Sequence, residues 1–372
     1  MSQRFDIAII GAGMAGASLA AEVAPYASVV LLEGEDQPGY HSTGRSAAFW
    51  SETYGGPFVQ PLTTASKHLL EAPEPDFSER PFLSPRGALH IADARGEAAL
   101  DDLLASFGGS VELHALDRAE LAARLPMLRT GWNRAVAEPS CADIDVAALH
   151  AAYLRSARRD GAILLTSAEV LALAREAGAW RLTTKAGPVA ADIVVDAAGA
   201  WADPIATFAG ARPLGIRPYR RTLVQLAMAP PADPGLPLVM DAAERFYFKP
   251  EAGGRLWLSP HDETPCEPCD AVPEELDTAI AIDRFEQAVD WPIERVERRW
   301  AGLRSFAPDR LPVYGFDADV PGFFWCAGQG GFGIQTAPAA AKLAAALLLG
   351  RQADPVVAAI DPAAYAPARF TN

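Results

Sequence analysis

A glycine-rich turn near the N-terminus constrains the fold more than any other feature of this sequence. Gly11, Gly13 and Gly16 form a GxGxxG pattern that directly follows Phe5–Ile10, an apolar run of buried-strand length. An alanine-rich segment of helical character comes next, and a second apolar run follows at Ser28–Leu32. In this order the first glycine permits a tight turn, the second lets the backbone approach a pyrophosphate, and the third lets helix and strand pack closely. The sequence therefore predicts a dinucleotide-binding unit.

An acidic residue stands where such a unit contacts a ribose. Glu33 lies at the end of the second apolar run, so its carboxylate is placed to accept hydrogen bonds from the adenosine ribose. A carboxylate at this place would repel a 2′-phosphate, which disfavours NADP. The free N–H groups at the start of the intervening helix favour the pyrophosphate. The pattern alone does not choose between NAD and FAD.

Composition narrows the classes of partner. The chain has 32 Lys and Arg against 47 Asp and Glu, a net charge of −15, and a surface this acidic disfavours nucleic acid. No run of 18 uncharged apolar residues occurs, so no membrane span is expected. The absence of a signal-peptide core and the low cysteine content favour a cytoplasmic protein. Neither the histidine spacing nor the single Cys266/Cys269 pair supports a metal site.

The rest of the chain is typical of two interleaved domains. Residues 142–215 hold a capped helix and strand-like runs, and residues 300–372 return to the same α/β style with a strand and a helix from about Ile334. Between them, β-like runs separated by Pro and Gly turns indicate an antiparallel sheet. We predict an α/β fold. A discontinuous Rossmann-type domain (residues 1–80, 142–215 and 300–372) would bind the nucleotide, and an inserted α+β domain (81–141 and 216–299) would bind the substrate on its antiparallel sheet.

Further motifs are spread over nearly the whole chain. They lie at Pro38–Ala48, Leu83–Arg86, Ala142–Asp145, Ala197–Trp201, Arg212–Gly215, Phe246–Pro250, Trp300–Phe306 and Gly328–Thr336. Together with the glycine turn, they resemble the FAD-dependent D-amino acid oxidase superfamily. The first of them is most similar to the bacterial D-amino acid dehydrogenases, especially D-arginine dehydrogenase. The resemblance implies a non-covalently bound FAD, a small amino acid substrate, and oxygen or a quinone as electron acceptor.

The resemblance also implies which residues hold the FAD. Ser42 or Thr43 is predicted to cap a helix beginning near Arg45, which would offer a second anion-binding N-terminus, and Val170 would meet the adenine. The glycines of residues 328–333 would expose backbone donors to the negative charge that a reduced flavin carries around N1 and O2. The full set of expected FAD contacts is Gly11, Gly13, Ala15, Gly16, Glu33, Gly34, Ser42, Thr43, Gly44, Arg45, Ser46, Ala47, Ala48, Val170, Gly199, Gly330, Gly331, Phe332, Gly333, Ile334 and Gln335.

Two arginines and two tyrosines are the expected catalytic contacts to the substrate. A forked guanidinium suits bidentate capture of a carboxylate, and Arg304 stands in an apolar segment where a solvated arginine is unexpected. The resemblance assigns the substrate carboxylate to Arg304 and Arg221, with Arg220 as the alternative if the register differs by one. It also assigns Tyr247 to the carboxylate and places Tyr54 on a mobile loop that covers the site.

The expected side-chain pocket departs from D-arginine dehydrogenase. Where those enzymes carry a histidine and an acid for a cationic side chain, this chain has Phe49 and, after Gly87, Ala88. An unpaired buried cation is costly, so these residues favour a neutral side chain. Glu52, on the same loop as Tyr54, is an acid that could restore a negative charge, although we expect it to be solvated.

These expectations combine into one function and two alternatives. The chain is predicted to oxidise a small, neutral D-amino acid by hydride transfer from Cα to flavin N5. The imino acid product would hydrolyse to a keto acid and ammonia. Glycine, or a secondary amine such as sarcosine, is the alternative substrate. A flavin-binding subunit that passes electrons within a hetero-oligomer is the alternative from another class, and it would show little activity alone.

Overall fold

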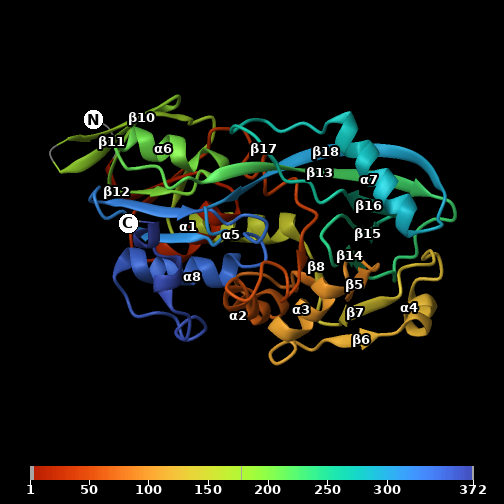
Figure 1. Cartoon of the computed structure of the whole chain (residues 1–372). Coiled ribbons are helices and arrows are strands. Elements are labelled where there is room, and N and C mark those ends of the chain that lie inside the picture. The colour runs from red at the N-terminus through yellow and green to blue at the C-terminus, as the bar shows by residue number, and fades with distance from the viewer. Residues whose placement is uncertain (1–3, 177, 371–372) are drawn as a thin grey trace.

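The structure, a computed structural model, describes residues 4–176 and 178–370 and contains two large β-sheets and one small one (Figure 1). The first sheet has eight strands: β1 (Arg4–Ile10), β2 (Val29–Leu32), β9 (Ile163–Leu165), β10 (Val170–Glu176), β11 (Ala179–Thr184), β12 (Gly187–Asp196), β19 (Val313–Phe316) and β20 (Phe323–Ala327). β1 pairs in parallel with β2 and with β12, and the second half of β12 pairs in parallel with β20. The last part of the chain therefore returns to the sheet that the first part begins.

Helices cover both faces of this sheet. They are α1 (Met14–Val23), α2 (Gln60–Glu71), α5 (Val146–Arg159), α6 (Ala202–Phe208) and α8 (Ala337–Leu349). α1, α5 and α8 bury their alanine and leucine side chains against one face, and α6 lies against the other. The Asp145 side chain caps α5 by accepting from the Ala148 N–H, as the sequence predicts. This layered arrangement confirms the predicted Rossmann-type α/β fold.

The second sheet is mostly antiparallel and has nine strands. They are β5 (Ala88–Ala92), β6 (His114–Leu116), β7 (Arg134–Glu138), β13 (Arg217–Met228), β14 (Leu238–Asp241), β15 (Tyr247–Glu251), β16 (Arg255–Ser259), β17 (Thr264–Pro265) and β18 (Ile293–Phe306). The helices of this region are α3 (Glu97–Phe107), α4 (Arg118–Arg124) and α7 (Glu275–Ala288). α7 packs Phe285 on Phe248 of β15, with ring centroids 5.2 Å apart. α4 begins with the capping box that Asp117 and Glu120 predict.

The two domains meet along long connecting elements. β13 and β18 pair antiparallel over twelve registered positions and run from the second sheet towards the first (Figure 1). A small sheet is formed by β3 (Phe49–Trp50), β4 (Leu83–Pro85) and β8 (Ala142–Ile144). β4 and β8 lie in the sequence next to the points where the chain passes from one predicted domain to the other. β18 continues to Phe306, so residues 300–306, which the predicted bounds assign to the nucleotide domain, pair with β13 in the second sheet.

Two expectations about helices are wrong. Residues 40–45 form turns, and no helix begins near Arg45, because the hydroxyls of Ser42 and Thr43 are engaged elsewhere, with Leu303 O and Met14 N. The last helix begins at Ala337 and not at Ile334. The preceding residues form turns, and the side chain of Gln335 among them bonds to Ser51, Tyr54 and Thr63. Such non-local bonds leave no local sequence signal.

Candidate active site

At two positions of the N-terminal turn, any residue other than glycine would clash with the backbone. Gly11 has φ of +99°, and a Cβ there would lie 2.4 Å from the backbone oxygen of Ala197. A Cβ on Gly16 would lie 1.9 Å from the backbone oxygen of Gly11. Gly13 differs, because its backbone is extended and it is the N-cap of α1 without any side-chain cap. Because glycine has no side chain, the N-cap residue cannot accept a hydrogen bond from the first N–H groups of α1. Those N–H groups that remain free are suited to bind an anion.

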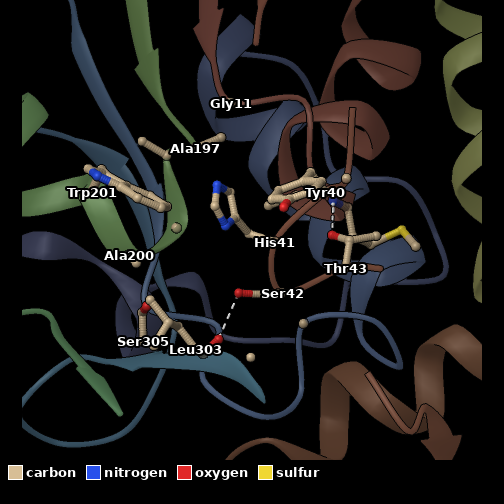
Figure 2. Close-up of a pocket in the computed structure, with 18 of the residues that line it drawn as sticks. Gly11, Tyr40, His41, Ser42, Thr43, Ala197, Ala200, Trp201, Leu303 and Ser305 are labelled. Atoms are coloured by element: carbon tan, nitrogen blue, oxygen red, sulfur yellow. Dashed lines mark hydrogen bonds between the residues drawn. The ribbon is translucent and has the colours of Figure 1, made fainter. Parts of the chain in front are cut away.

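The loop at residues 39–47 is bonded to both domains, close to the N-terminus of α1. The Thr43 hydroxyl accepts from the Met14 N–H at 2.9 Å, and the Ser42 hydroxyl donates to Leu303 O of β18 at 2.7 Å (Figure 2). Arg45 donates to Ala271 O and pairs with Asp270 at 2.5 Å. The loop is thus bonded to the helix of one domain and to the strands of the other.

Glu33 stands at the end of β2 with both carboxylate oxygens engaged. One oxygen accepts from Ala12 N and the other from Glu35 N, each at 3.1 Å. Burial raises the pKa of Glu33, and the backbone N–H groups oppose that rise. These bonds hold the carboxylate beside the glycine turn, where the ribose is expected.

One continuous cavity of about 600 Å³ connects these elements to the second sheet. Of the expected FAD contacts, it is lined by Gly11, Gly13, Ala15, Glu33, Gly34, Ser42, Thr43, Arg45, Ser46, Ala47, Val170, Gly199, Gly330, Gly331, Gly333 and Ile334. Five others are not part of the lining: Gly16, Gly44, Ala48, Phe332 and Gln335. Gly16 and Gly44 are packing glycines, since a Cβ would meet a backbone oxygen at 1.9 and 2.8 Å.

The cavity fits FAD in shape and in chemistry. It is lined by Val170 and Glu33, by residues at the start of α1, and by Gly330 and Gly331 beside the second sheet. A Cβ on Gly330 would lie 2.2 Å from the Phe306 ring, so only glycine fits at this position. Val170 would face the adenine, Glu33 the ribose, α1 the pyrophosphate, and residues 330–334 the flavin ring. Cys326 is buried outside the lining, which is consistent with the expected non-covalent FAD.

Sequence reasoning gave no role to the aromatic side chains in the middle of this cavity. His41 lies between Tyr40 and Trp201, with ring centroids 5.0 and 4.8 Å away (Figure 2). All three line the cavity. Trp201 ends the motif Ala197–Trp201, two residues after Gly199, and this large aromatic residue among small ones is the sequence signal that could have found it.

At the other end of the cavity lies Arg304 of β18. Its Nη1 donates to the Tyr54 hydroxyl, and its guanidinium carbon lies 5.6 Å from the centre of the Tyr54 ring. No ion pair joins Arg304 to an acidic residue of the described chain. Burial works against its charge, but the oxygens of Tyr54 and Tyr247 raise the pKa of Arg304 above its usual value.

Arg221 of β13 lies beside Arg304 and lines the same end of the cavity. Its Nε donates to Asp262 O at 2.7 Å, and its Nη2 lies 3.3 Å from Glu263. Its Nη1 is buried and has no hydrogen-bond partner in the described part of the protein. Burial, together with the charge of Arg304, lowers the pKa of Arg221.

The neighbouring Arg220, the register alternative, points away from this site. Its guanidinium pairs with Glu274 at 2.5 Å and with Asp277 at 3.0 Å, both near the start of α7. Because successive residues of a strand face opposite sides of a sheet, only one of the two arginines can reach the cavity. The cavity lining contains Arg221 and not Arg220.

Tyr247 lines the cavity, whereas Phe246 and Phe248 face the opposite side of the sheet and pack in the core beneath α7. Phe49 lies between the two tyrosines of the site, 5.1 Å from the ring of Tyr54 and 5.9 Å from that of Tyr247. Ala88 is buried in the same apolar cluster. Phe49, Ala88 and Tyr54 adjoin this end of the cavity through that cluster and are not part of its lining.

Glu52 does not match its expected state. It is 8% exposed, and its carboxylate accepts from Thr64 at 2.9 Å and from Ser140 at 3.2 Å. It is therefore buried and hydrogen-bonded, because hydroxyl partners 12 and 88 residues away replace water. It does not line the cavity.

Two further groups near the site were missed. His261 stands 5.5 Å from the ring of Tyr247 and 6.5 Å from that of Tyr54, with a buried Nδ1 that has no partner in the described structure. Burial, with the charges of Arg221 and Arg304, holds the pKa of His261 well below its usual value. Glu138 lies at the end of β7 with a fully buried carboxylate. Neither residue belongs to a motif with recognisable spacing.

Over the described residues, no group of three or more His, Cys, Asp or Glu side chains is arranged to hold a metal ion. Among the same residues, none of the helices has the length and apolar character needed to cross a membrane.

A dinucleotide-binding sheet and an antiparallel sheet that share one long cavity define a flavin-dependent oxidoreductase. The chain belongs to the DAO family of FAD-dependent oxidoreductases, whose profile matches residues 6–347. It is 26% identical to glycine oxidase of Geobacillus kaustophilus over 369 residues (94% of each chain) and 28% identical to glycine oxidase of Pseudomonas aeruginosa over 384 residues (99% of each).

Solved structures agree with this assignment. The crystal structure of the Geobacillus kaustophilus glycine oxidase superposes with a TM-score of 0.86 over 99% of both chains. L-proline dehydrogenase from P. horikoshii, at 22% identity, superposes with a TM-score of 0.84 over 100% of this chain and 99% of that one. At this identity the second likeness shows the fold alone.

Gly13→Val should yield folded protein that retains little FAD. A Cβ at this position would meet only the Thr43 hydroxyl, at 3.2 Å, so the fold tolerates a side chain, but a branched one would obstruct backbone approach to the pyrophosphate. The ratio of flavin to protein absorbance after purification measures the loss. Gly109→Val is the matched control, since a Cβ at Gly109 meets nothing within 4 Å. A full flavin complement in Gly13→Val would contradict the expected FAD orientation.

Proposed function

We propose that this protein oxidises a small, neutral amino acid, the D-enantiomer where the substrate is chiral, whose carboxylate is held between Arg221 and Arg304. The observation that carries the proposal is the state of the two guanidinium groups at the end of the FAD cavity. Arg304 forms no ion pair in the described structure, and Arg221, although it lies 3.8 Å from Asp262 and 3.3 Å from Glu263, keeps a buried Nη1 without a hydrogen-bond partner. A buried cation without an anionic partner is unfavourable, and a substrate carboxylate would supply that partner.

The tyrosines complete this arrangement. Because Arg304 donates to the oxygen of Tyr54, the Tyr54 O–H is left to donate to a carboxylate oxygen. Tyr247 lines the same end of the cavity and adds a second hydroxyl. Two-point fixation of the carboxylate orients Cα towards the residues that would carry the flavin ring, and such orientation supplies much of the rate enhancement. FAD, when bound, supplies the acceptor for the hydride of Cα.

Glycine or a secondary amine is the second candidate. Two relatives that match 94% and 99% of this chain are named glycine oxidases, and the aromatic cluster of Phe49, Tyr54 and Tyr247 beside this end of the cavity suits a substrate with little or no side chain. Both candidates need the same carboxylate anchor. They differ only in the side chain and in the substituents on nitrogen.

Anaerobic bleaching of the flavin by the purified protein tests the proposal. Glycine, sarcosine, D-alanine, D-valine and L-alanine form the panel, and glycinamide and D-alaninamide are matched controls that lack the carboxylate. We expect at least one acid to bleach the flavin and its amide to fail. Equal bleaching by acid and amide would refute the carboxylate anchor. No bleaching by any member of the panel would favour the electron-transfer subunit.

A further inference from the structure

Glu138 is a buried carboxylate that the proposed chemistry does not use. It lies at the end of β7, with no exposed surface. Its Oε2 accepts from the hydroxyls of Ser51 at 3.0 Å and Thr53 at 2.7 Å, and lies 3.1 Å from Nε2 of His90. Its Oε1 accepts from the backbone N–H of Glu52 at 2.8 Å. Both oxygens are therefore engaged, mainly by one short segment, residues 51–54, which we call the Tyr54 segment.

A second side chain, that of Gln335, also bonds to the Tyr54 segment. The Gln335 amide oxygen accepts from Ser51 N at 3.1 Å, and its nitrogen donates to Tyr54 O at 3.1 Å and to the Thr63 hydroxyl at 3.0 Å. The resemblance implies a covering loop at Tyr54 and a cofactor contact at Gln335. The structure shows the Tyr54 segment bonded at both ends, with Gln335 as one of its supports.

The Tyr54 segment ends at the carboxylate anchor. The Tyr54 hydroxyl accepts from Nη1 of Arg304, and both groups pack on Gly331, where a Cβ would lie 3.0 Å from Arg304 and 3.2 Å from Tyr54. A shift of the Tyr54 backbone would therefore move the group that orients the guanidinium. We propose that Glu138 is a positioning residue for the substrate carboxylate, acting through the Tyr54 segment on Arg304. This inference rests on the proposed function, because it assumes that Arg304 holds a carboxylate.

The negative charge of Glu138 is part of this role. Burial disfavours the charge, but the hydrogen bond and charge of His90, with the bonds from Thr53 and Ser51, lower the pKa of Glu138. A glutamine has the same shape but presents an acceptor on one side only. If its amide oxygen stays on the fixed backbone N–H of Glu52, its N–H groups face the Ser51 and Thr53 hydroxyls and His90, which must then turn from donating to accepting. In the opposite orientation an N–H of the amide faces the N–H of Glu52. Glu138→Gln therefore perturbs the Tyr54 segment without removing volume.

The test measures carboxylate binding apart from turnover. Benzoate is titrated into the FAD-loaded protein, and its Kd is read from the change in flavin absorption, for the wild type, Glu138→Gln, Tyr54→Phe and the double variant. We expect each single variant to weaken benzoate binding about tenfold, as coupled neighbours in one network do. We expect the double variant to bind no more weakly than Tyr54→Phe alone. With the best amino acid, KM should rise more than kcat falls.

Two further variants keep the outcome decisive. Thr53→Val removes one donor and leaves the carboxylate intact, so it should weaken benzoate binding by about threefold even if Glu138→Gln fails to fold. Asp241→Asn is the matched control, because Asp241 is a buried carboxylate on β14 that holds Ala243 N and Arg245. It should lower Tm and leave the benzoate Kd unchanged.

An unchanged benzoate Kd in Glu138→Gln, or strictly additive effects with Tyr54→Phe, would overturn the positioning role while leaving the proposed function intact. Benzoate binding that responds as expected, in a protein that no amino acid reduces, would overturn the proposed reaction and support the positioning role. A wild-type protein that binds no benzoate and that no amino acid of the panel reduces would overturn both.

Discussion

Arg304→Ala is expected to raise KM for an amino acid substrate strongly while leaving FAD bound. Removal of one partner from a desolvated, charge-assisted contact costs about 2–5 kcal/mol, which is roughly 30-fold to several thousand-fold in kcat/KM. The effect should be large here because Arg304 forms no ion pair in the described structure. The partner it would lose is the substrate itself. Steady-state kinetics on protein with a measured flavin content give the answer.

Two variants bracket this result. Arg304→Lys keeps the charge but loses the forked geometry, so it should recover only part of the activity. Arg299→Ala removes an exposed arginine five residues earlier on the same strand, 3.9 Å from Glu275, and should leave the kinetics unchanged. Wild-type KM in Arg304→Ala would mean that the substrate carboxylate is held elsewhere, and Arg221 would then be the next residue to test.

The sequence was sufficient for those parts of the fold that local chemistry determines. The glycine turn, the apolar strands on either side of it and the capped helix that begins after Asp145 all have short-range physical causes, and each lies where it was predicted. The helix expected near Arg45 does not form, because a non-local hydrogen bond determines the structure there. Thr43 is an ordinary N-cap by composition, but its hydroxyl serves Met14, 29 residues away, and no local rule reports such a bond.

The same distinction holds for the site. Arg304, Arg221 and Tyr247 were found because a family resemblance supplied the long-range information, and the structure brings all three to one end of the cavity. Glu138 was missed because its partners lie 48 to 87 residues away along the chain. Glu52 was misjudged because its burial depends on Thr64 and Ser140. Single polar residues that act through such partners have no sequence signature of their own.

The second large effect concerns the substrate side chain. Of the described residues that line the cavity, the acidic ones are Glu33, Glu35 and Glu169, and they belong to its nucleotide end. Near the arginines, Glu263 already pairs with Arg221 and Arg310. Asp262 accepts from Thr222 and lies 3.8 Å from Arg221, and Glu52 is bonded to hydroxyl donors. A cationic side chain would therefore enter a region with two guanidinium groups and no free carboxylate. The desolvation penalty for an unpaired ion is several kcal/mol, or roughly 100-fold or more in affinity.

Neutral D-amino acids should accordingly exceed D-arginine and D-lysine in kcat/KM by at least about 100-fold. D-norleucine is the informative comparison, because it has the carbon chain of D-lysine without the charge. A preference for D-norleucine over D-lysine isolates the electrostatic effect from size, and each buried methylene of the apolar chain adds about 0.8 kcal/mol. If D-lysine or D-arginine proved the better substrate, an acid would have to reach the pocket. Glu52→Gln would then identify it, since that variant should abolish the preference only if Glu52 leaves Thr64 and Ser140 to meet the cation.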